Sequence, residues 1–254
     1  MNEEKVITLN SLAKACADCH LQDVCLPIGI SRKDMQRLDD IIKRKRPLPA
    51  GQALFRQGED FRALYAIRSG SFKSVVYENN GRESINAFHF PGEILGLDSI
   101  SERSCPSSAI SLETSSVCEL PFEELEELAQ HIKGLQHQLL RIMSREIKAE
   151  DAFLRSLTHR SADQRLASFI INLAERRGNH GYSNHEFKLA MSRSDIANYL
   201  GLAVETISRL FTRFQNEGLL EIRRKKLKIL KPEALMVTAR TGSDSDKPDS
   251  NLAK

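Results

Sequence analysis

The chain has 254 residues, of which 41% are hydrophobic and 28% are charged, and this composition predicts a folded protein with one large domain or two ordinary ones. No apolar run approaches the roughly 20 residues that cross a bilayer, and the first residues lack the basic and then apolar order of a signal peptide, so we expect a cytoplasmic protein without a membrane partner. The formal net charge of +3 is too small to indicate a nucleic-acid partner by itself.

The first predicted element is a cysteine-rich segment in which Cys16, Cys19 and Cys25 form a C-x2-C-x5-C pattern. Cytosolic proteins seldom use structural disulfides, so this spacing indicates metal ligation or redox chemistry. Three thiolates on a short loop can bind one soft metal centre, and the fourth ligand then comes from Cys105 or Cys118. The spacing favours an iron–sulfur cluster and a zinc site equally. A redox disulfide and buried, inert cysteines are the less favoured alternatives.

Short β-rich runs separated by turn residues follow, between about Lys43 and Pro121. Three of them are Ala63–Ile67, Ser71–Tyr77 and Ser84–Phe90. The pair Asn80-Gly81 between the last two is a hairpin signal, because both residue types tolerate the positive φ of a tight turn. This region predicts an antiparallel β-barrel or β-roll.

After Pro121 the apolar residues recur with the helical period, first in a short acidic helix and then in a long one from about Lys133 to Leu157. One side of the long helix carries a heptad seam, with spacings of 3 and 4 residues, at Leu140, Met143, Ile147, Glu150, Leu154 and Leu157. A second apolar row is expected to face the roll, and it consists of Leu135, Leu139, Ile142 and Phe153.

The two apolar rows fit either burial within one monomer or a parallel homodimer. The helix-turn-helix pattern described below favours the dimer, since helix-turn-helix proteins usually bind two DNA half-sites by two-fold symmetry. In such a dimer the two Glu150 carboxylates meet, which costs free energy, so we expect a marginal and switchable association. Thr158-His159-Arg160 is a candidate hinge, after which Ser161 and Gln164 predict a capping box that opens an amphipathic helix to about Arg177.

The segment Ser192 to Asn216 has the pattern of a helix-turn-helix. Arg193–Leu200 predicts a short helix, Gly201 supplies the turn, and Ala203–Asn216 predicts a second helix. The apolar side chains of the second helix are spaced to face inward, at Ile207, Leu210, Phe211 and Phe214. Its polar side is expected to contact DNA through Val204, Glu205, Thr206, Ser208, Arg209, Thr212 and Arg213.

These residue types suit base edges, because arginine donates bidentately to guanine, glutamate accepts from the cytosine amine, and Val204 or Thr206 can contact a thymine methyl group. Leu219 to Leu230 predicts a basic hairpin, or wing, that contacts phosphates. An ordinary helical hairpin is the alternative, but the turn glycine, the polar face and the basic wing occur in the order that DNA recognition needs. The last residues are polar and are expected to form a disordered tail.

Four motifs in matching order resemble the FNR (fumarate and nitrate reduction) regulators of bacteria, of the pseudomonad Anr kind. They are the C-x2-C-x5-C start, Leu64–Gly70, Leu112–Phe122 and Val204–Arg209, and the resemblance covers about residues 10 to 230. It implies an α+β fold with an N-terminal cluster-binding loop, an antiparallel β-roll like that of cyclic-nucleotide-binding proteins, a long dimerisation helix and a C-terminal winged helix-turn-helix. The expected domains are 1–30, 31–132, 133–158, 159–235 and a tail at 236–254.

The resemblance also implies a [4Fe-4S] cluster on Cys16, Cys19, Cys25 and Cys118, the last of which stands in the family's Val-Cys-Glu position. Cys105 matches no family ligand. In such proteins the intact cluster favours the dimer, and its oxidation by oxygen to [2Fe-2S] and its loss return inactive monomers. Glu150 falls where the family carries an acidic residue that keeps the dimer metastable, and the implied DNA half-site is TTGAT.

The cyclic-AMP receptor proteins share this β-roll and are the nearest rival. Their pocket needs an arginine against the cyclic phosphate, whereas the segment after Pro91–Gly96 continues here with Pro106-Ser107-Ser108-Ala109, so a cyclic nucleotide is not expected. No arrangement of His, Asp and Ser at catalytic spacing indicates an enzyme. We therefore expect an oxygen-responsive regulator of anaerobic genes that contacts RNA polymerase, in part through the Asn79-Asn80-Gly81 turn.

Overall fold

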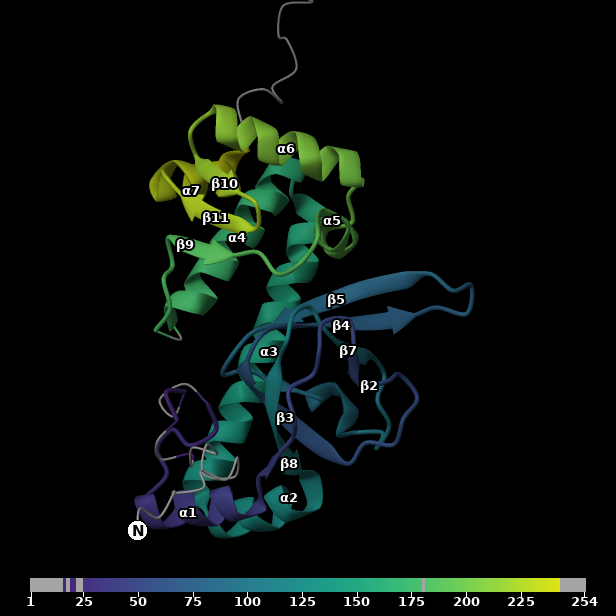
Figure 1. The fold of residues 1–254 in the computed structure, drawn as a ribbon, viewed down its shortest axis with the longest axis vertical. Coiled ribbons are helices and arrows are strands. Elements are labelled where there is room, and N and C mark those ends of the chain that lie inside the picture. Colours follow the sequence, from purple (N-terminus) through teal and green to yellow (C-terminus); the bar gives the residue numbers. More distant parts are fainter. Residues whose placement is uncertain (1–15, 17–18, 22–24, 180, 243–254) are drawn as a thin grey trace, which may run out of the picture. The chain divides into compact units, whose positions relative to one another are not determined.

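The computed structural model describes residues 16, 19–21, 25–179 and 181–242, and the chain divides into two compact units (Figure 1). The first unit comprises residues 1–77 and 88–145, and the second comprises residues 78–87 and 146–254. The expected α+β class is confirmed, with a β-rich region followed by helices and a small C-terminal sheet. The division falls between Arg145 and Glu146, inside the long helix.

The β-rich region forms two four-stranded sheets, with strand orders β1-β8-β3-β6 and β2-β7-β4-β5, so the expected roll is confirmed. The central pairs, β3 with β8 and β4 with β7, are antiparallel. The strands are β1 Lys43–Arg44, β2 Ala53–Phe55, β3 Ala63–Ser69, β4 Phe72–Tyr77, β5 Glu83–His89, β6 Ile94–Leu95, β7 Ser108–Ser111 and β8 Ser116–Pro121, with a 3-10 turn at Leu97–Ser99.

Alternation along the strands separates two apolar cores in the first unit. Leu64 and Ala66 of β3 pack with apolar residues of the helices, whereas Ile67 packs between the sheets with Phe72 and Val117. Successive side chains of a strand point to opposite faces, so a single strand can serve both cores. Cys25 and Cys118 lie against the helical core, which is the first indication of where the cysteines meet.

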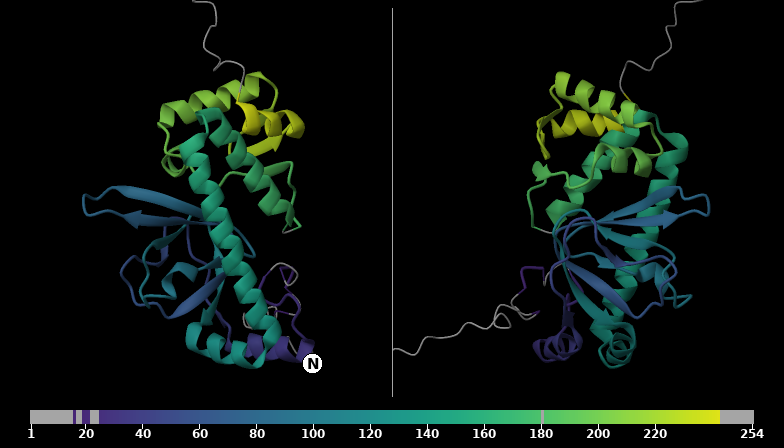
Figure 2. Two further views of the ribbon diagram at one scale, coloured as in Figure 1. Left: turned by 180° about the vertical axis from the view of Figure 1, so that it is seen from behind. Right: turned by 45° about the vertical axis from the view of Figure 1, so that its right-hand side comes forward.

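Helices α1 Arg32–Ile41 and α2 Phe122–His131 lie side by side at one end of the roll (Figures 1 and 2). The sequence analysis did not predict α1. Its start is nevertheless marked, because the Ser31 hydroxyl accepts a hydrogen bond from the Asp34 N–H at 3.2 Å, as an N-cap does. The helix presents Leu38 to the core and carries Asp39 to the cysteine-rich segment.

Two turns of the roll require glycine. Gly70, between β3 and β4, has φ +83°, and a Cβ at this position would lie 2.1 Å from the Ser115 hydroxyl oxygen. Gly81, in the turn between β4 and β5, has φ +79° with open space around it, and its N–H donates to the Glu78 carbonyl at 2.8 Å. The hairpin predicted from Asn80-Gly81 is therefore confirmed.

The long helix α3 spans Lys133–His159. Of the row predicted to face the roll, Leu135 and Ile142 are buried in the helical core and Leu139 packs against it. The prediction for Phe153 was wrong, because its ring stacks on Tyr199 of helix α5 (Arg193–Leu200), with centroids 4.2 Å apart. The helix passes through the proposed hinge residues Thr158 and His159 and ends there.

The second unit contains a winged helix-turn-helix, as predicted. Helix α4 Ala162–Asn179 precedes α5, which Gly201 ends in a left-handed conformation with φ +63°, and α6 Val204–Asn216 follows. The wing strands β10 Leu220–Arg223 and β11 Lys226–Ile229 pair with each other, and β9 Glu186–Lys188, which the sequence pattern did not reveal, adds a third strand.

A disordered tail was expected from residue 236, but residues 236–241 belong to helix α7, Pro232–Thr241. This helix buries Leu235, Thr238 and Ala239. Three apolar or small residues on one side are enough to pack a short helix on its neighbour α4, even where the overall composition is polar. Residues 243–254 of the expected tail lie outside the described residues. Among the helices that the structure describes, none is long and apolar enough to cross a membrane.

Candidate metal centre and DNA interface

Four cysteines from two distant parts of the sequence line one small cavity. Cys16, Cys19 and Cys25 come from the N-terminal segment, and Cys118 comes from β8. The other lining residues are apolar apart from Arg68, and they are Leu21, Leu26, Pro27, Leu38, Ile42, Ala66, Ile67 and Leu120. The structure thus brings together the four cysteines that the family resemblance implies.

Strand pairing fixes the position of Cys118. In β8 it lies opposite Ala66 of β3 on one side and opposite Arg44 of β1 on the other. The N-terminal segment is held locally, since the Cys19 N–H donates to the Cys16 carbonyl at 3.2 Å. The side-chain amide of Gln138, which is buried on α3, donates to the Cys25 carbonyl at 3.3 Å. The cysteine segment is therefore tied to the long helix as well as to the sheet.

Burial raises the pKa of three of the thiols. It raises the pKa of Cys25 to about 12, although a hydrogen bond from the Leu26 backbone acts in the opposite direction. The pKa of Cys16 is raised by burial and by the neighbouring Asp39 carboxylate. Burial also raises the pKa of Cys118, against the lowering effect of the Arg44 and Arg68 guanidinium groups. Burial therefore favours the neutral form of these three thiols.

Sequence reasoning missed two charged residues beside the thiols, Asp39 and Arg44. The Asp39 carboxylate accepts a hydrogen bond from the Cys16 N–H at 3.0 Å and forms an ion pair with Arg44. Burial alone would raise the pKa of Asp39, but these hydrogen bonds lower it below its usual value. The S-x-x-D pattern at Ser31 could have revealed α1, and with it Asp39.

Cys105 lies elsewhere, as the resemblance implies. It is 5% exposed in the core between the sheets, and it lines a separate cavity of about 410 Å³ with Phe55, Tyr65 and Gly96. All five cysteines are free thiols.

The donor set fits an iron–sulfur cluster, because all four converging ligands are soft sulfur atoms and their surroundings are apolar. Within the described part of the chain, no three His, Cys, Asp or Glu side chains are placed to hold a single metal ion. In a [4Fe-4S] cluster each thiolate binds a different iron atom, so the sulfur atoms need to surround a volume and not to meet at one point.

The candidate DNA surface lies on α6. Its apolar residues Ile207, Leu210, Phe211 and Phe214 are buried, as predicted. Val204, Glu205, Ser208, Arg209 and Thr212 are exposed on the opposite side, and Thr206 is half-buried. The hydroxyl groups of Ser208 and Thr212 donate to backbone carbonyls one turn earlier, at 2.9 and 3.1 Å.

Arg213 is separate from this polar face. Its guanidinium lies 3.4 Å from the carboxylate of Asp163 on α4 and 3.7 Å from the carboxylate of Glu217. Sequence reasoning grouped Arg213 with the DNA-contacting residues, and it missed Asp163. Adjacent helical residues point about 100° apart, which explains why the side chains of Thr212 and Arg213 face different ways.

The basic wing is exposed at its tip. Arg224 and Lys225 form the turn between β10 and β11, and Arg224 adopts a positive φ of +57°. Lys226 forms an ion pair with Glu186 of β9. Exposed cations at the end of a hairpin suit contacts to DNA phosphates.

The heptad seam of α3 is exposed in the single chain. Leu140, Ile147 and Leu154 are 58%, 66% and 61% exposed, Glu150 is exposed between them, and Met143 and Leu157 are half-buried. A row of large apolar side chains exposed to water is typical of a protein–protein interaction site.

The Asp98 carboxylate lies beside Ser107, in the segment where the sequence analysis looked for the phosphate-binding arginine of the cyclic-AMP receptor proteins. The Ser107 hydroxyl donates to the Asp98 carboxylate at 3.1 Å, and the Ser99 hydroxyl also donates to it at 3.2 Å. A carboxylate at this place would repel a phosphate.

Comparisons with known protein families match both the β-roll and the helix-turn-helix. A Crp-like helix-turn-helix domain matches residues 164–237, and a cyclic nucleotide-binding domain matches residues 45–131. The chain is 46% identical over 230 residues to the transcriptional activator protein FnrA of Stutzerimonas stutzeri, covering 91% of this chain and 94% of that protein. The chain belongs to the FNR family. It is also 46% identical to the transcriptional activator protein anr of Pseudomonas aeruginosa, covering 89% of this chain and 93% of that protein.

Among solved structures, FixK2 from Bradyrhizobium japonicum has the same fold, with a TM-score of 0.71 and 24% identity over 78% of this chain and 96% of that one. As an FNR-family member with a helix-turn-helix, the protein is a DNA-binding transcription regulator, and no enzymatic family is indicated.

Proposed function

We propose that this FNR-family protein is an oxygen-sensing transcription regulator whose sensor is a [4Fe-4S] cluster on Cys16, Cys19, Cys25 and Cys118. The observation that carries the proposal is that one apolar cavity collects four thiols from two distant parts of the chain. Three cysteines within ten residues and a fourth on a strand would be an unusual way to fill a core, since a core needs volume and not sulfur.

When bound, such a cluster supplies a redox centre that oxygen can attack. The chain's own residues would hold it in three ways. The thiols ligate it, the positive charges of Arg44 and Arg68 offset the negative charge of the thiolates, and the apolar lining limits access of water. Gln138 then connects the ligand segment to α3, because its amide donates to the Cys25 carbonyl.

We propose further that the active form is a parallel homodimer joined along Leu140, Met143, Ile147, Glu150, Leu154 and Leu157. The exposure of this row supports the proposal. Glu150 keeps the dimer close to its dissociation threshold, because two like charges in a partly apolar seam repel each other. Air then shifts the chain to inactive monomers, and a shift of this kind needs only a few kcal/mol.

The dimer is proposed to act in the cytoplasm on a palindrome of TTGAT-like half-sites, activating or repressing genes of anaerobic metabolism. Glu205 and Arg209 of each α6 would read base edges, Val204, Thr206, Ser208 and Thr212 would complete the contact, and the wing would bind phosphates. The turn at Asn79–Gly81, which is exposed, is a proposed contact for RNA polymerase.

The test uses full-length protein purified under anaerobic conditions, with iron and sulfide analysis, visible absorption spectra and DNA binding before and after exposure to air. We expect four iron and four sulfide per chain, together with loss of binding in air. Cys118→Ser should lose the iron and the colour, whereas the matched variant Cys105→Ser should keep both. A colourless wild-type protein that binds DNA equally in air would refute the proposal, and so would full iron content in Cys118→Ser. Heat released on titration with cyclic AMP would support the rival class.

A further inference from the structure

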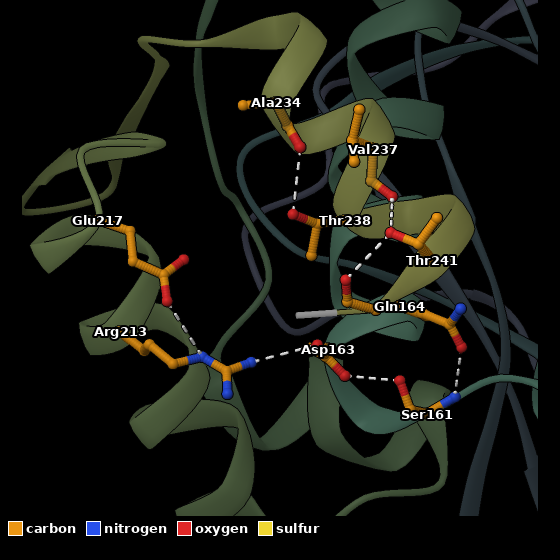
Figure 3. A network of polar contacts seen from close by, with 10 residues as sticks. Ser161, Asp163, Gln164, Arg213, Glu217, Ala234, Val237, Thr238 and Thr241 are labelled. Atoms are coloured by element: carbon orange, nitrogen blue, oxygen red, sulfur yellow. Dashed lines mark hydrogen bonds and ion pairs between the residues drawn. The ribbon is translucent and has the colours of Figure 1, made fainter. Parts of the chain in front are cut away.

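A buried ion pair joins the recognition helix to the helix that follows α3. Asp163 lies in the first turn of α4 and is 1% exposed. Arg213 of α6 places its Nη2 atom 3.4 Å from the Asp163 carboxylate, and its Nε atom lies 3.7 Å from Glu217 one turn further along α6. Figure 3 shows the guanidinium between these two carboxylates.

The Asp163 carboxylate is held in place from its other side (Figure 3). The Ser161 hydroxyl donates to its second oxygen at 2.6 Å. Only one of the two hydrogen bonds of the expected capping box forms. The Ser161 N–H donates to the Gln164 side chain at 2.8 Å, but the Ser161 hydroxyl bonds to Asp163 and not to the Gln164 backbone. The Gln164 amide in turn donates to the Arg240 carbonyl of α7 at 3.0 Å. Helices α4, α6 and α7 are therefore linked through Asp163 and the adjacent Gln164.

A carboxylate so deeply buried is costly unless a cation and hydrogen bonds satisfy it. Arg213 supplies the cation, and it is only 30% exposed, in contrast to the exposed Arg209 one turn before it. If Arg213 turned outward to a DNA phosphate, Asp163 would lose this cation. The energetic balance therefore favours an inward orientation.

We infer that Arg213 is a positioning residue and not a phosphate contact. Together with Asp163 it fixes the direction in which α6 presents Glu205 and Arg209 to the DNA. The inference rests on DNA recognition through α6. It implies that the orientation of the recognition helix is set by α4, which begins three residues after α3 ends.

The two roles predict different salt dependence. A phosphate contact releases counterions, so its removal lowers the magnitude of the slope of log K against log salt by about 0.9 per contact, or about 1.8 for the two copies in a dimer. Loss of a positioning contact leaves that slope unchanged and lowers only the ratio of specific to random binding. A purely structural defect would lower the amount of folded protein, and with it both kinds of binding equally.

The experiment measures fluorescence anisotropy of the full-length protein, prepared anaerobically, on a TTGAT palindrome and on a scrambled duplex at several KCl concentrations. The variants are Arg213→Gln, Asp163→Asn and the double variant, with Lys225→Gln of the exposed wing as a control for a phosphate contact. We expect each single variant to lose about tenfold in specific binding with an unchanged slope and unchanged random binding. The control should reduce the slope.

A reduced slope in Arg213→Gln with no effect of Asp163→Asn would overturn the inference, as would equal losses on both duplexes. Urea unfolding of the wild type, Arg213→Gln, Asp163→Asn and the double variant supplies a second measurement that needs no DNA. We expect the double variant to be less destabilised than the sum of the single variants, because each single variant already removes the interaction between the two side chains. Strictly additive losses would contradict the ion pair. If the wild-type protein does not distinguish the palindrome from the scrambled duplex, the proposed half-site fails, and the unfolding cycle decides the ion pair.

Discussion

The rings of Phe153 and Tyr199 stack with centroids 4.2 Å apart and an interplanar angle of 10°. Phe153 belongs to the C-terminal half of α3 and Tyr199 to α5, the first helix of the helix-turn-helix. Phe169 of α4 also contacts Tyr199, in a tilted arrangement with centroids 5.7 Å apart. The stack thus joins three helices of the second unit, and it places the tyrosine in an apolar environment.

Burial in this stack raises the pKa of Tyr199 to about 12. The folded-state pKa is higher than that of an unfolded tyrosine, about 10, so its contribution to stability is complete below pH 10 and is lost as the pH rises toward 12. Tyr199→Phe should therefore remove one group from the tyrosines that ionise near pH 12 in a titration followed by ultraviolet absorption. Loss of a group that ionises near pH 10 instead would show that Tyr199 is not buried.

Arg209→Ala should weaken binding to the specific site by about 1 to 3 kcal/mol and should affect random DNA much less, because the side chain donates to a base edge. Competition binding with specific and scrambled duplexes gives both values. Asn216→Ala, at the far end of the same helix, is the matched control, since it is exposed and outside the predicted contact. Equal losses on both duplexes would assign Arg209 to phosphate binding.

Glu150→Ala should stabilise the proposed dimer by removing two facing charges, and we expect the dissociation constant to fall about tenfold or more, which is about 1.4 kcal/mol. Dimers and DNA binding should then persist in air, as sedimentation and mobility-shift measurements can show. Asp151→Ala removes a charge from the next position, where it pairs with Arg155, and should leave the oxygen response unchanged. Unchanged oxygen sensitivity in Glu150→Ala would contradict the seam.

Gly70→Ala should destabilise the roll by about 2 to 5 kcal/mol, because a positive φ and a clash with Ser115 act together. Gly81→Ala provides the comparison, since Gly81 has a similar φ but no atom within 4 Å of the added Cβ. There the loss should be only about 1 to 2 kcal/mol. The difference in urea unfolding between the two variants measures the steric part.

Local patterns in the sequence were enough to predict the β-roll, the long helix, the helix-turn-helix and the wing. Each depends on a period or a turn residue that acts over a few positions, such as Asn80-Gly81 and Gly201. The tail prediction used composition alone, and it failed where Leu235 and Ala239 pack α7 against the rest of the unit.

The tertiary structure decided which distant residues meet. Spacing alone allowed either Cys105 or Cys118 as the fourth thiol, and strand pairing put Cys118 in the cavity with Cys16, Cys19 and Cys25. It also turned Phe153 onto Tyr199 and Arg213 toward Asp163. Period and spacing describe one element at a time, whereas a buried charge or ring is directed by whatever packs against it from another element. The sequence by itself therefore determined that this protein carries a cysteine motif and a DNA-reading helix, and the packing determined how each is held.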